Sequence, residues 1–385
     1  MNAIVQKLNA EQATLTEWRR YLHQRPELAF EEKETAAFVA EKLKSWGYDV
    51  VEGIGGTGVV GTLKNGAGTK SIGLRADMDA LPIQEMGDIP HKSQVPGKSH
   101  MCGHDAHTTM LLAAARYLSQ TRNFNGTVRV FFQPAEEIMG GAVAMIKDGL
   151  FERFPVDQVL GMHNMPGLEL GTLHFRTGPL MAAVDNWEIE LTGKGSHGSM
   201  PEKAIDPVVA GASLVMALQT IVSRNVAAQD SAVVTIGAFQ SGDAGNVIPQ
   251  KAILRLSIRS SRPETRTLVL DKIRSITKAQ AEAFGVAFEI REGQPGAVLV
   301  NDPAVTERVL GVAQKMFGAD KVIPEGVAYM GSEDFAFMAQ KRPASYVFIG
   351  NGDTAMVHHP MYDFDDRNLP IGAAFWVGAT EDYLK

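Results

Sequence analysis

Residues 107–137 read HTTMLLAAARYLSQTRNFNGTVRVFFQPAEE, and this stretch decides the fold class. Positions 107–120 have the apolar and small residues of a buried helix, and 127–132 (TVRVFF) form the β-branched and aromatic run of a strand. The strand leads directly into two glutamates. A helix joined to a strand in this way is the repeating unit of a layered α/β domain.

The same alternation of helices and strands continues on both sides of this stretch. The expected helices are 2–24, 31–46, 140–150, 303–317, 332–340 and a C-terminal helix from about 369. The expected strands are 48–52, 59–63, 71–77, 157–163 and 345–349. This order predicts an α/β domain built from an N-terminal and a C-terminal segment of the chain.

A different order of elements occupies the region between them. Strands are expected at 186–191, 232–240, 251–260 and 286–292, with helices at 207–224 and 264–285. This β-α-β-β-α-β order is that of a ferredoxin-like split unit, and it ends at the linker-like residues GQPG, 293–296. We therefore predict a catalytic domain formed by 1–183 and 297–385, interrupted by a smaller α+β domain at 184–296.

Composition excludes several classes of protein. Of the 385 residues, 45% are hydrophobic and 21% are charged, which is the balance of a folded globular protein. The net charge of -7 argues against a nucleic-acid binder, and a single cysteine cannot form an intrachain disulfide. The N-terminal residues lack the apolar core of a signal peptide, and no apolar stretch is long enough to span a membrane. We expect a cytoplasmic protein that binds neither nucleic acid nor membrane.

Acidic and imidazole side chains follow three of the predicted strands. Strand 71–77 runs into Asp79, strand 127–132 into Glu136, and strand 157–163 ends at His163. In open α/β sheets, ligands bind at the carboxyl ends of the strands. Three such side chains at strand ends predict a functional site there.

The densest group of metal-competent residues is HMCGHDAH at 100–107. It holds three of the ten histidines, the only cysteine and an aspartate, and a second histidine pair, His358-His359, lies near the C-terminus. Thiolate, imidazole and carboxylate are the ligands of first-row transition metals. A single histidine is more often a hydrogen-bonded structural residue, but this cluster favours a metal site.

The adjacent glutamates Glu136 and Glu137 add a second signal. Consecutive residues outside a helix project in different directions, so one carboxylate can bind metal while its neighbour faces the reacting water. This is the arrangement of metal-assisted hydrolysis, in which a general base removes a proton from water. Alone, the pair would be read as the acidic start of a helix; beside the cysteine and histidine cluster, it indicates a hydrolase.

Seven short motifs together carry a family resemblance. They are RADMDALPIQE, HMCGHDAHTT, QPAEE, GMHNMP, GKGSHGSMP, GNVIP and HHPMYDFDD. With them the chain resembles the M20 metallopeptidase/amidohydrolase family, in the branch of hippurate hydrolases, N-acyl-amino-acid aminoacylases and auxin-conjugate hydrolases. The resemblance covers nearly the whole chain. It implies a zinc-peptidase-like catalytic domain interrupted by a ferredoxin-like lid or dimerisation domain, and a homodimer.

The resemblance also implies roles for individual residues. The implied metal ligands are Cys102, His104, Glu137, His163 and His358. Glu136 takes the place of the general base and Asp79 that of an aspartate orienting the site. His197 matches a histidine that reaches the partner subunit's active site and stabilises the oxyanion. Two further residues, Asn246 and Arg259, resemble substrate contacts, and a guanidinium can grip a carboxylate bidentately.

The activity implied by the resemblance is metal-dependent hydrolysis of the amide bond of N-acyl-L-amino acids, of the hippurate or N-acetyl type. The expected cofactor is a divalent transition metal, two ions per subunit, chosen among zinc, manganese, cobalt and nickel. Deacetylation of N-acetyl-diaminopimelate and dipeptide hydrolysis are alternatives within the family. Outside it, Cys102 could be the nucleophile of a cysteine hydrolase, or the chain could bind metal without catalysis.

Overall fold

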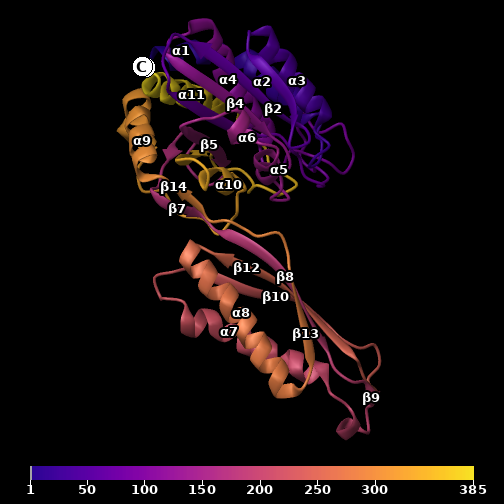
Figure 1. Cartoon of the computed structure of the whole chain (residues 1–385). Helices are drawn as coiled ribbons and strands as arrows, with labels where there is room; N and C mark the ends of the chain where they lie inside the picture. The colour runs from indigo at the N-terminus through magenta and orange to yellow at the C-terminus, as the bar shows by residue number, and fades with distance from the viewer. Residues whose placement is uncertain (1) are drawn as a thin grey trace. The chain divides into compact units, whose positions relative to one another are not determined.

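The computed structural model describes residues 2–385 and divides the chain into two compact units (Figure 1). The first unit comprises Met1–Gly178, Val300–Val327 and Asp334–Lys385, and the second comprises Pro179–Leu299 and Ala328–Glu333. The second unit is thus an insertion into the first. The functional assignment of the two as a catalytic domain and a lid remains a prediction.

An eight-stranded mixed sheet forms the centre of the first unit. Its strands, in spatial order, are β1 (Asp49–Ile54), β2 (Gly58–Asn65), β4 (Gly126–Gln133), β3 (Ser71–Asp77), β5 (Gln158–Met165), β16 (Ala344–Gly350), β6 (Leu173–His174) and β15 (Val322–Ile323). Strands β4, β3, β5 and β16 are parallel neighbours, so their carboxyl ends lie at one edge of the sheet. This edge positions the candidate site.

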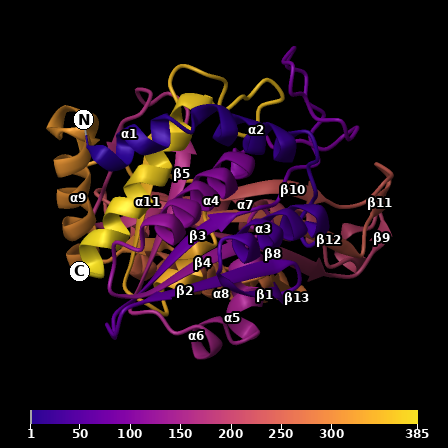
Figure 2. The same ribbon diagram turned by 90° about the horizontal axis from the view of Figure 1, so that it is seen from above.

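Helices cover both faces of this sheet, as the view in Figure 2 shows for the upper face. The helices of the first unit are α1 (Ala3–Asn9), α2 (Gln12–His23), α3 (Lys33–Ser45), α4 (His104–Thr121), α5 (Gly141–Lys147), α6 (Leu150–Arg153), α9 (Pro303–Phe317), α10 (Phe335–Ala339) and α11 (Leu369–Tyr383). Short 3-10 turns lie at Ala319–Lys321 and Asp366–Asn368. Helix α4 packs between the sheet and α11, because its residues 104–115 are all buried and include three consecutive alanines, Ala113–Ala115. Each fully buried leucine of this core contributes about 2 kcal/mol.

Four expected helices differ from the observed ones, and the one expected at 332–340 is the shorter α10, which begins at Phe335. The helix expected at 2–24 is divided at Ala10 and Glu11 into α1 and α2, and the helix expected at 140–150 is divided into α5 and α6. Helix α4 begins at His104, three residues before the expected start, because Gly103 adopts a left-handed backbone with φ of 89°. A Cβ on Gly103 would overlap Asn164 Nδ2 and lie 2.5 Å from Tyr362 Oη. Glycine therefore permits the close approach of three chain segments at the start of α4.

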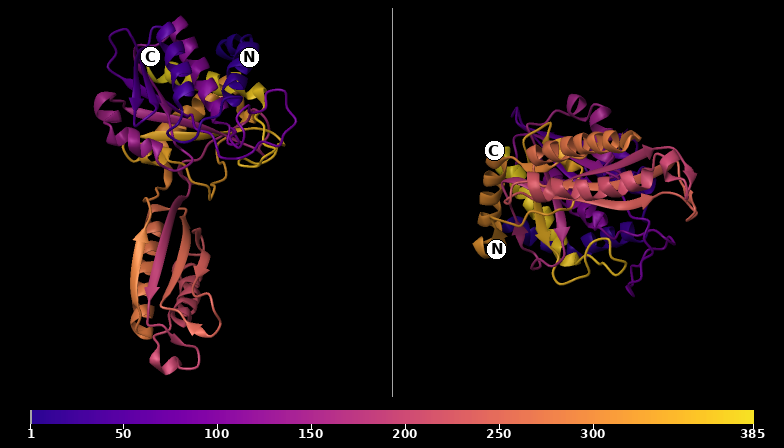
Figure 3. Two further views of the ribbon diagram at one scale, coloured as in Figure 1. Left: turned by 90° about the vertical axis from the view of Figure 1, so that its right-hand side faces the viewer. Right: turned by 90° about the horizontal axis from the view of Figure 1, so that it is seen from below.

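The second unit is an antiparallel sheet with two helices on one face, visible from two further directions in Figure 3. Its main elements are β8 (Ala183–Thr192), α7 (Pro207–Asn225), β10 (Ala232–Gln240), β12 (Lys251–Ser260), α8 (Pro263–Phe284) and β13 (Ala287–Glu292). The strand order β10-β12-β8-β13 is that of a ferredoxin-like sheet, so the predicted β-α-β-β-α-β unit is confirmed. Smaller elements of this unit are β9 (Ser196–His197), which pairs with β11 (Val247–Ile248), and a 3-10 turn at Pro201–Lys203. Strands β7 (Gly178–Met181) and β14 (Leu299–Asn301) pair with each other where the chain enters and leaves the unit.

Helix α7 is the one helix of the described residues whose length and composition would allow it to cross a membrane. Such a result for one helix is weak evidence, because the core helix of a folded domain passes the same test. The buried residues of α7 belong to the hydrophobic core of the second unit, among them Leu214, Leu218 and Ile221.

Candidate metal centre

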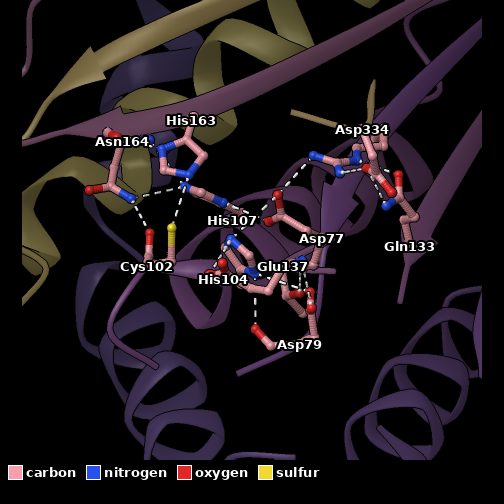
Figure 4. Close-up of polar contacts among 12 residues, drawn as sticks. Asp77, Asp79, Cys102, His104, His107, Gln133, Glu137, His163, Asn164 and Asp334 are labelled. Atoms are coloured by element: carbon pink, nitrogen blue, oxygen red, sulfur yellow. Dashed lines mark hydrogen bonds and ion pairs between the residues drawn. The ribbon is translucent and has the colours of Figure 1, made fainter. Parts of the chain in front are cut away.

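The candidate site lies at the carboxyl edge of the sheet in the first unit (Figure 4). Strand β3 ends at Asp77, β4 leads into Glu136 and Glu137, and β5 carries His163 near its end. Helix α4 begins at the same edge with His104. The prediction that strand ends gather these side chains rests on parallel pairing, and β3 pairs in parallel with both β4 and β5.

The structure brings together all five predicted metal ligands. Cys102 Sγ lies 3.4 Å from His163 Nε2, and Glu137 Oε2 lies 3.2 Å from His358 Nε2. His104 Nε2 lies 3.9 Å from Glu137 Oε1. These contacts form two overlapping groups of donor atoms, each within 4.8 Å: Cys102, His104 and His163, and Cys102, Glu137 and His358.

The donor atoms themselves fit a metal ion. His104 Nε2 and Glu137 Oε1 are buried and have no hydrogen-bond partner among the described residues. An unpaired buried polar group lowers the free energy of unfolding by about 1–3 kcal/mol. Two such atoms 3.9 Å apart are therefore expected to share a bound ligand. Sulfur, imidazole nitrogen and carboxylate oxygen are the donors preferred by zinc and other transition metals.

Asp79 contacts two of the predicted ligands, His104 and Glu137. Its Oδ1 and its backbone oxygen lie 3.2 and 2.9 Å from His104 Nδ1, and its Oδ2 accepts the backbone N–H of Glu137 at 3.0 Å. If Nδ1 of His104 donates to Asp79, Nε2 is left with the lone pair that a metal requires.

The turn that carries the two glutamates has an unusual backbone. Ala135 and Met139 are left-handed, with φ of 51° and 57°, and the N–H of Ala135 donates to Glu32 Oε1 at 2.9 Å. Left-handed residues other than glycine are sparsely populated and cluster at functional sites. The turn places a carboxylate oxygen of Glu136, only 6% exposed, within 4.8 Å of donor atoms of His104 and Glu137.

The predicted ligand His358 also has a left-handed backbone, with φ of 67°. Its N–H donates to the backbone oxygen of Met101 at 2.6 Å. This bond joins the loop that carries His358 to the segment that precedes Cys102. Two distant parts of the sequence are therefore held together by main-chain atoms at the metal centre.

Burial and nearby charges shift the pKa values of the predicted ligands. Burial, together with the nearby charges of Glu137 and Glu136, raises the pKa of the Cys102 thiol well above its usual range. Burial lowers the pKa of His163 well below its usual range. Burial opposes the charged form of His104, but Asp77 and Asp79 outweigh it and raise its pKa to about 10. Metal binding would therefore release protons from Cys102 and His104, whereas His163 would bind in the neutral form that it already has.

Sequence reasoning missed a buried network beneath the ligands. Arg75 on β3 donates to Asp77 Oδ2 at 2.8 Å, to Gln133 Oε1 at 2.9 Å and to Asp334 Oδ1 at 3.1 Å. Arg75, Asp77 and Asp334 are fully buried. Arg75 follows the apolar residues IGL of strand β3, and this is the signal that could have predicted the network, because an arginine is rarely buried without partners.

The three remaining predicted residues belong to the second unit. His197 on β9 pairs with Val247 on β11, and the N–H of Gly198 donates to the backbone oxygen of Asn246. His197 and Asn246 therefore lie beside each other in one exposed pair of antiparallel strands. Arg259 on β12 donates from Nη1 to the backbone oxygen of Met330 at 2.7 Å. Among the described residues, Arg259 forms no ion pair.

The ring of His197 has a defined hydrogen-bond partner. Its Nδ1 accepts the backbone N–H of Ser199 at 3.1 Å. A backbone N–H can only donate, so a neutral His197 carries its proton on Nε2. The exposed end of the ring is thus a hydrogen-bond donor.

A family model and several known proteins match the chain. The model of Peptidase family M20/M25/M40 matches residues 73–382. The hippurate hydrolase of Campylobacter jejuni subsp. jejuni is 45% identical over 385 residues, covering 100% of both chains. An IAA-amino acid hydrolase of Arabidopsis thaliana is 37% identical over 376 residues, 95% of this chain and 86% of its own. The crystal structure of a dinuclear metal binding peptidase of the M20 family from Bacillus subtilis has a TM-score of 0.86 at 32% identity, covering 98% of this chain and 99% of its own.

Proposed function

The chain belongs to Peptidase family M20/M25/M40, and from this premise we propose that it hydrolyses the amide bond of N-acyl-L-amino acids to a carboxylic acid and a free amino acid. The observation that carries the proposal is the convergence of five metal-competent side chains beside the buried carboxylate of Glu136. Hippurate and the IAA-amino acid conjugates of the similar proteins are amides of this kind, with an aromatic acyl group on an amino acid. The resemblance inferred from the motifs is confirmed at the level of the family.

In this proposal, Cys102, His104, Glu137, His163 and His358 hold two divalent transition-metal ions per subunit. The two overlapping donor groups support a pair of ions, as does the similarity to a dinuclear metal binding peptidase. When bound, the metal supplies a Lewis acid for the amide carbonyl and lowers the pKa of water. Zinc, cobalt, nickel and manganese suit this donor set to differing degrees.

Proton transfer is assigned to Glu136. Its carboxylate removes a proton from the attacking water and then delivers that proton to the nitrogen of the leaving amino acid. Asp79 holds His104 and the Glu137 backbone in place, through the three contacts described above. The buried position of Glu136 supports this role, because proton transfer is sensitive to competing water.

Stabilisation of the tetrahedral oxyanion is assigned to His197, acting from one subunit in the active site of the other. Its proton on Nε2 supports the role, because an oxyanion needs a positioned donor. Asn246, beside His197, is proposed to contact the substrate amide. Arg259 is proposed to bind the substrate carboxylate, since it meets a carbonyl and a hydroxyl oxygen in the structure and no carboxylate of the described residues.

A cytoplasmic homodimer assembled through the second unit completes the proposal. The edge strand β10, AVVTIGAFQ, carries no charge, and it exposes Val233 and Phe239. The neighbouring helix α7 exposes Met216 by 70% and Val209 by 53%. Unpaired apolar edge strands and apolar helix faces favour association. Sedimentation should therefore show a dimer, and a V233K/M216E double variant should shift it to the monomer.

The central experiment is a hydrolysis panel on metal-depleted and reloaded protein. Acetyl-, benzoyl- and indoleacetyl-amino acids are incubated with protein reloaded separately with zinc, manganese, cobalt or nickel, and the released amino acid is quantified. N-acetyl-diaminopimelate and dipeptides are included to test the alternatives within the family. Turnover is expected only after reloading. Absence of turnover on every substrate with every metal would contradict the proposal.

The same panel separates the proposal from a cysteine hydrolase. A nucleophilic Cys102 predicts activity in the presence of a chelator and a thioester that can be trapped on the protein. The raised pKa of the Cys102 thiol, caused by burial and by the charges of Glu137 and Glu136, opposes the thiolate that such an enzyme requires. We therefore expect chelation to abolish activity and no thioester to form.

A further inference from the structure

His107 lies inside the cysteine and histidine cluster, yet both of its ring nitrogens already have partners. Nδ1 is 2.7 Å from Asp77 Oδ1, and Nε2 accepts the backbone N–H of Asn164 at 3.0 Å. A backbone N–H can only donate, so Nε2 is unprotonated and the ring proton is on Nδ1, where it is donated to Asp77. His107 therefore has no lone pair left for a metal, although it lies within 4.8 Å of donor atoms of His104.

The Asp77 end of this contact is fixed by charge. Arg75 donates to the second carboxylate oxygen of Asp77 at 2.8 Å, and Asp77, Arg75 and His107 are all fully buried. Since the arginine compensates the carboxylate, Asp77 stays ionised and remains an acceptor for the ring proton of His107. The ion pair of Arg75 and Asp77 thus determines which tautomer His107 adopts.

The Asn164 end makes contact with three ligand-bearing segments. Its backbone oxygen lies 2.6 Å from His163 Nδ1, while its backbone N–H donates to His107, so the main chain of Asn164 is held on both sides of its Cα. Its side-chain Nδ2 donates to the backbone oxygen of Cys102 at 2.7 Å, and its Oδ1 accepts from Tyr362 Oη at 2.8 Å. Tyr362 lies four residues after the proposed ligand His358.

We propose that Asp77, His107 and Asn164 form a positioning relay that aims the ligand atoms of His163 and Cys102 at the metal (Figure 4). His163 donates from Nδ1 to the clamped oxygen of Asn164, which directs its Nε2 toward Cys102 Sγ. The backbone of Cys102 is held by the side chain of the same asparagine. The inference rests on the proposed function, because it assumes that Cys102 and His163 bind metal.

Cobalt binding tests the relay without relying on catalysis. Metal-depleted full-length protein is titrated with Co²⁺, and affinity is measured together with the thiolate-to-cobalt charge-transfer band. In His107→Phe, which removes the contacts of the ring with Asp77 and Asn164, Co²⁺ affinity should fall about 10–100-fold, as is typical when a residue that orients metal ligands is removed. His107→Gln, which keeps an acceptor for the Asn164 N–H, should recover part of the loss. His174→Phe is the matched control, a half-buried histidine on β6 whose ring contacts Thr172.

Asp77→Asn provides an independent test if His107→Phe does not fold, as judged by circular dichroism of the metal-free protein. The asparagine amide can donate to Nδ1, which would move the ring proton to Nε2, against the N–H of Asn164. A weakened charge-transfer band and lower Co²⁺ affinity are then expected.

Unchanged affinity and an unchanged band in His107→Phe or Asp77→Asn would overturn the relay. An equal loss of affinity in His174→Phe would also overturn it, because the effect would not be specific to the relay. Failure of the unmodified protein to bind Co²⁺ is a different result, because it would refute the proposed metal ligands and, with them, the proposed function.

Discussion

The floor of the candidate metal centre and the open face of the second unit's sheet both concentrate charged side chains, but in opposite environments. Beneath the candidate metal centre, Arg75 and Asp77 are 0% exposed, and Arg75 donates hydrogen bonds to a defined set of buried acceptors. On the open sheet face, Arg255 is 55% exposed and Arg291 is 47% exposed, and Arg291 meets three glutamates, Glu188, Glu190 and Glu289. Both regions thus contain arginine–carboxylate ion pairs, which are buried in the first region and exposed in the second.

The difference lies in what each environment permits. Exposed ion pairs are screened by salt and exchange partners easily, so each contributes little. Buried charges lack water as an alternative partner, so removal of one partner leaves the other uncompensated. A charged group that is buried with defined partners, as Arg75 is, can therefore fix the positions of neighbouring side chains. The exposed ion pairs of Arg255 and Arg291 cannot do this.

Of the variants considered, Glu136→Gln, in the buried candidate metal centre, should reduce turnover most. The glutamine cannot accept the proton of the attacking water, so turnover should fall by about 10²–10⁴-fold while the metal content stays unchanged. Turnover of a benzoyl amino acid and elemental analysis measure the two quantities. Glu152→Gln, at an exposed helical position of the same unit, is the control. Turnover close to that of the unmodified protein in metal-loaded Glu136→Gln would refute the assignment.

Replacement of one arginine in each region tests the comparison directly. Arg75→Met leaves Asp77 and Asp334 buried without their cation, and the free energy of unfolding of the first unit should fall by about 3–5 kcal/mol. The matched Arg291→Met should leave the free energy of unfolding of the second unit unchanged within error. Urea unfolding followed by circular dichroism and by intrinsic fluorescence measures both. Equal losses in the two variants would show that burial does not distinguish these networks.

His197→Ala tests whether an exposed residue can still contribute to catalysis. Loss of an oxyanion donor should lower kcat by about 10²–10³-fold, with metal content and melting temperature unchanged. Lys203→Ala, in the exposed turn that follows β9, is the control. The role across subunits would be untenable if fully active protein sedimented as a monomer.

His23 supplies the smallest expected effect, and it depends on pH. Burial alone would lower the pKa of His23, but hydrogen bonds to Asp105 and Glu85 raise it from 6.5 to about 9. The other charged or titratable groups that face His23 are Arg19, His91 and His100. Because the pKa in the folded state is the higher one, the stabilisation is complete below the unfolded pKa of about 6.5 and is lost as pH rises through about 9.

The free energy of unfolding should therefore decrease across that interval in the unmodified protein, and the decrease should be smaller in His23→Gln. Urea unfolding at a series of pH values measures both curves. Parallel curves for the two proteins would show that the charge of His23 does not contribute.

The sequence was sufficient to predict the fold class, because strand and helix patterns repeat locally. It also predicted which side chains would meet at the sheet edge, since parallel strands place their ends together. The role of His107 could not be predicted, because its two partners, Asp77 and Asn164, lie 30 and 57 residues away in the sequence. The sequence showed three histidines of equal chemistry. Tertiary contacts separate them, since His104 has an unpaired nitrogen, His107 has none, and both nitrogens of His100 are without hydrogen bonds among the described residues.

Gly103 has a consequence for how natural variants of this chain should be judged. A substitution to alanine needs one nucleotide, adds one methyl group, and changes neither a charge nor a proposed ligand. At this position the methyl group would occupy space already taken by Asn164 and Tyr362, and the backbone is left-handed. Gly103→Ala, although chemically conservative, would thus push apart the segments that carry Cys102, Asn164 and Tyr362. It would be harmful for reasons that a comparison of amino-acid properties does not register.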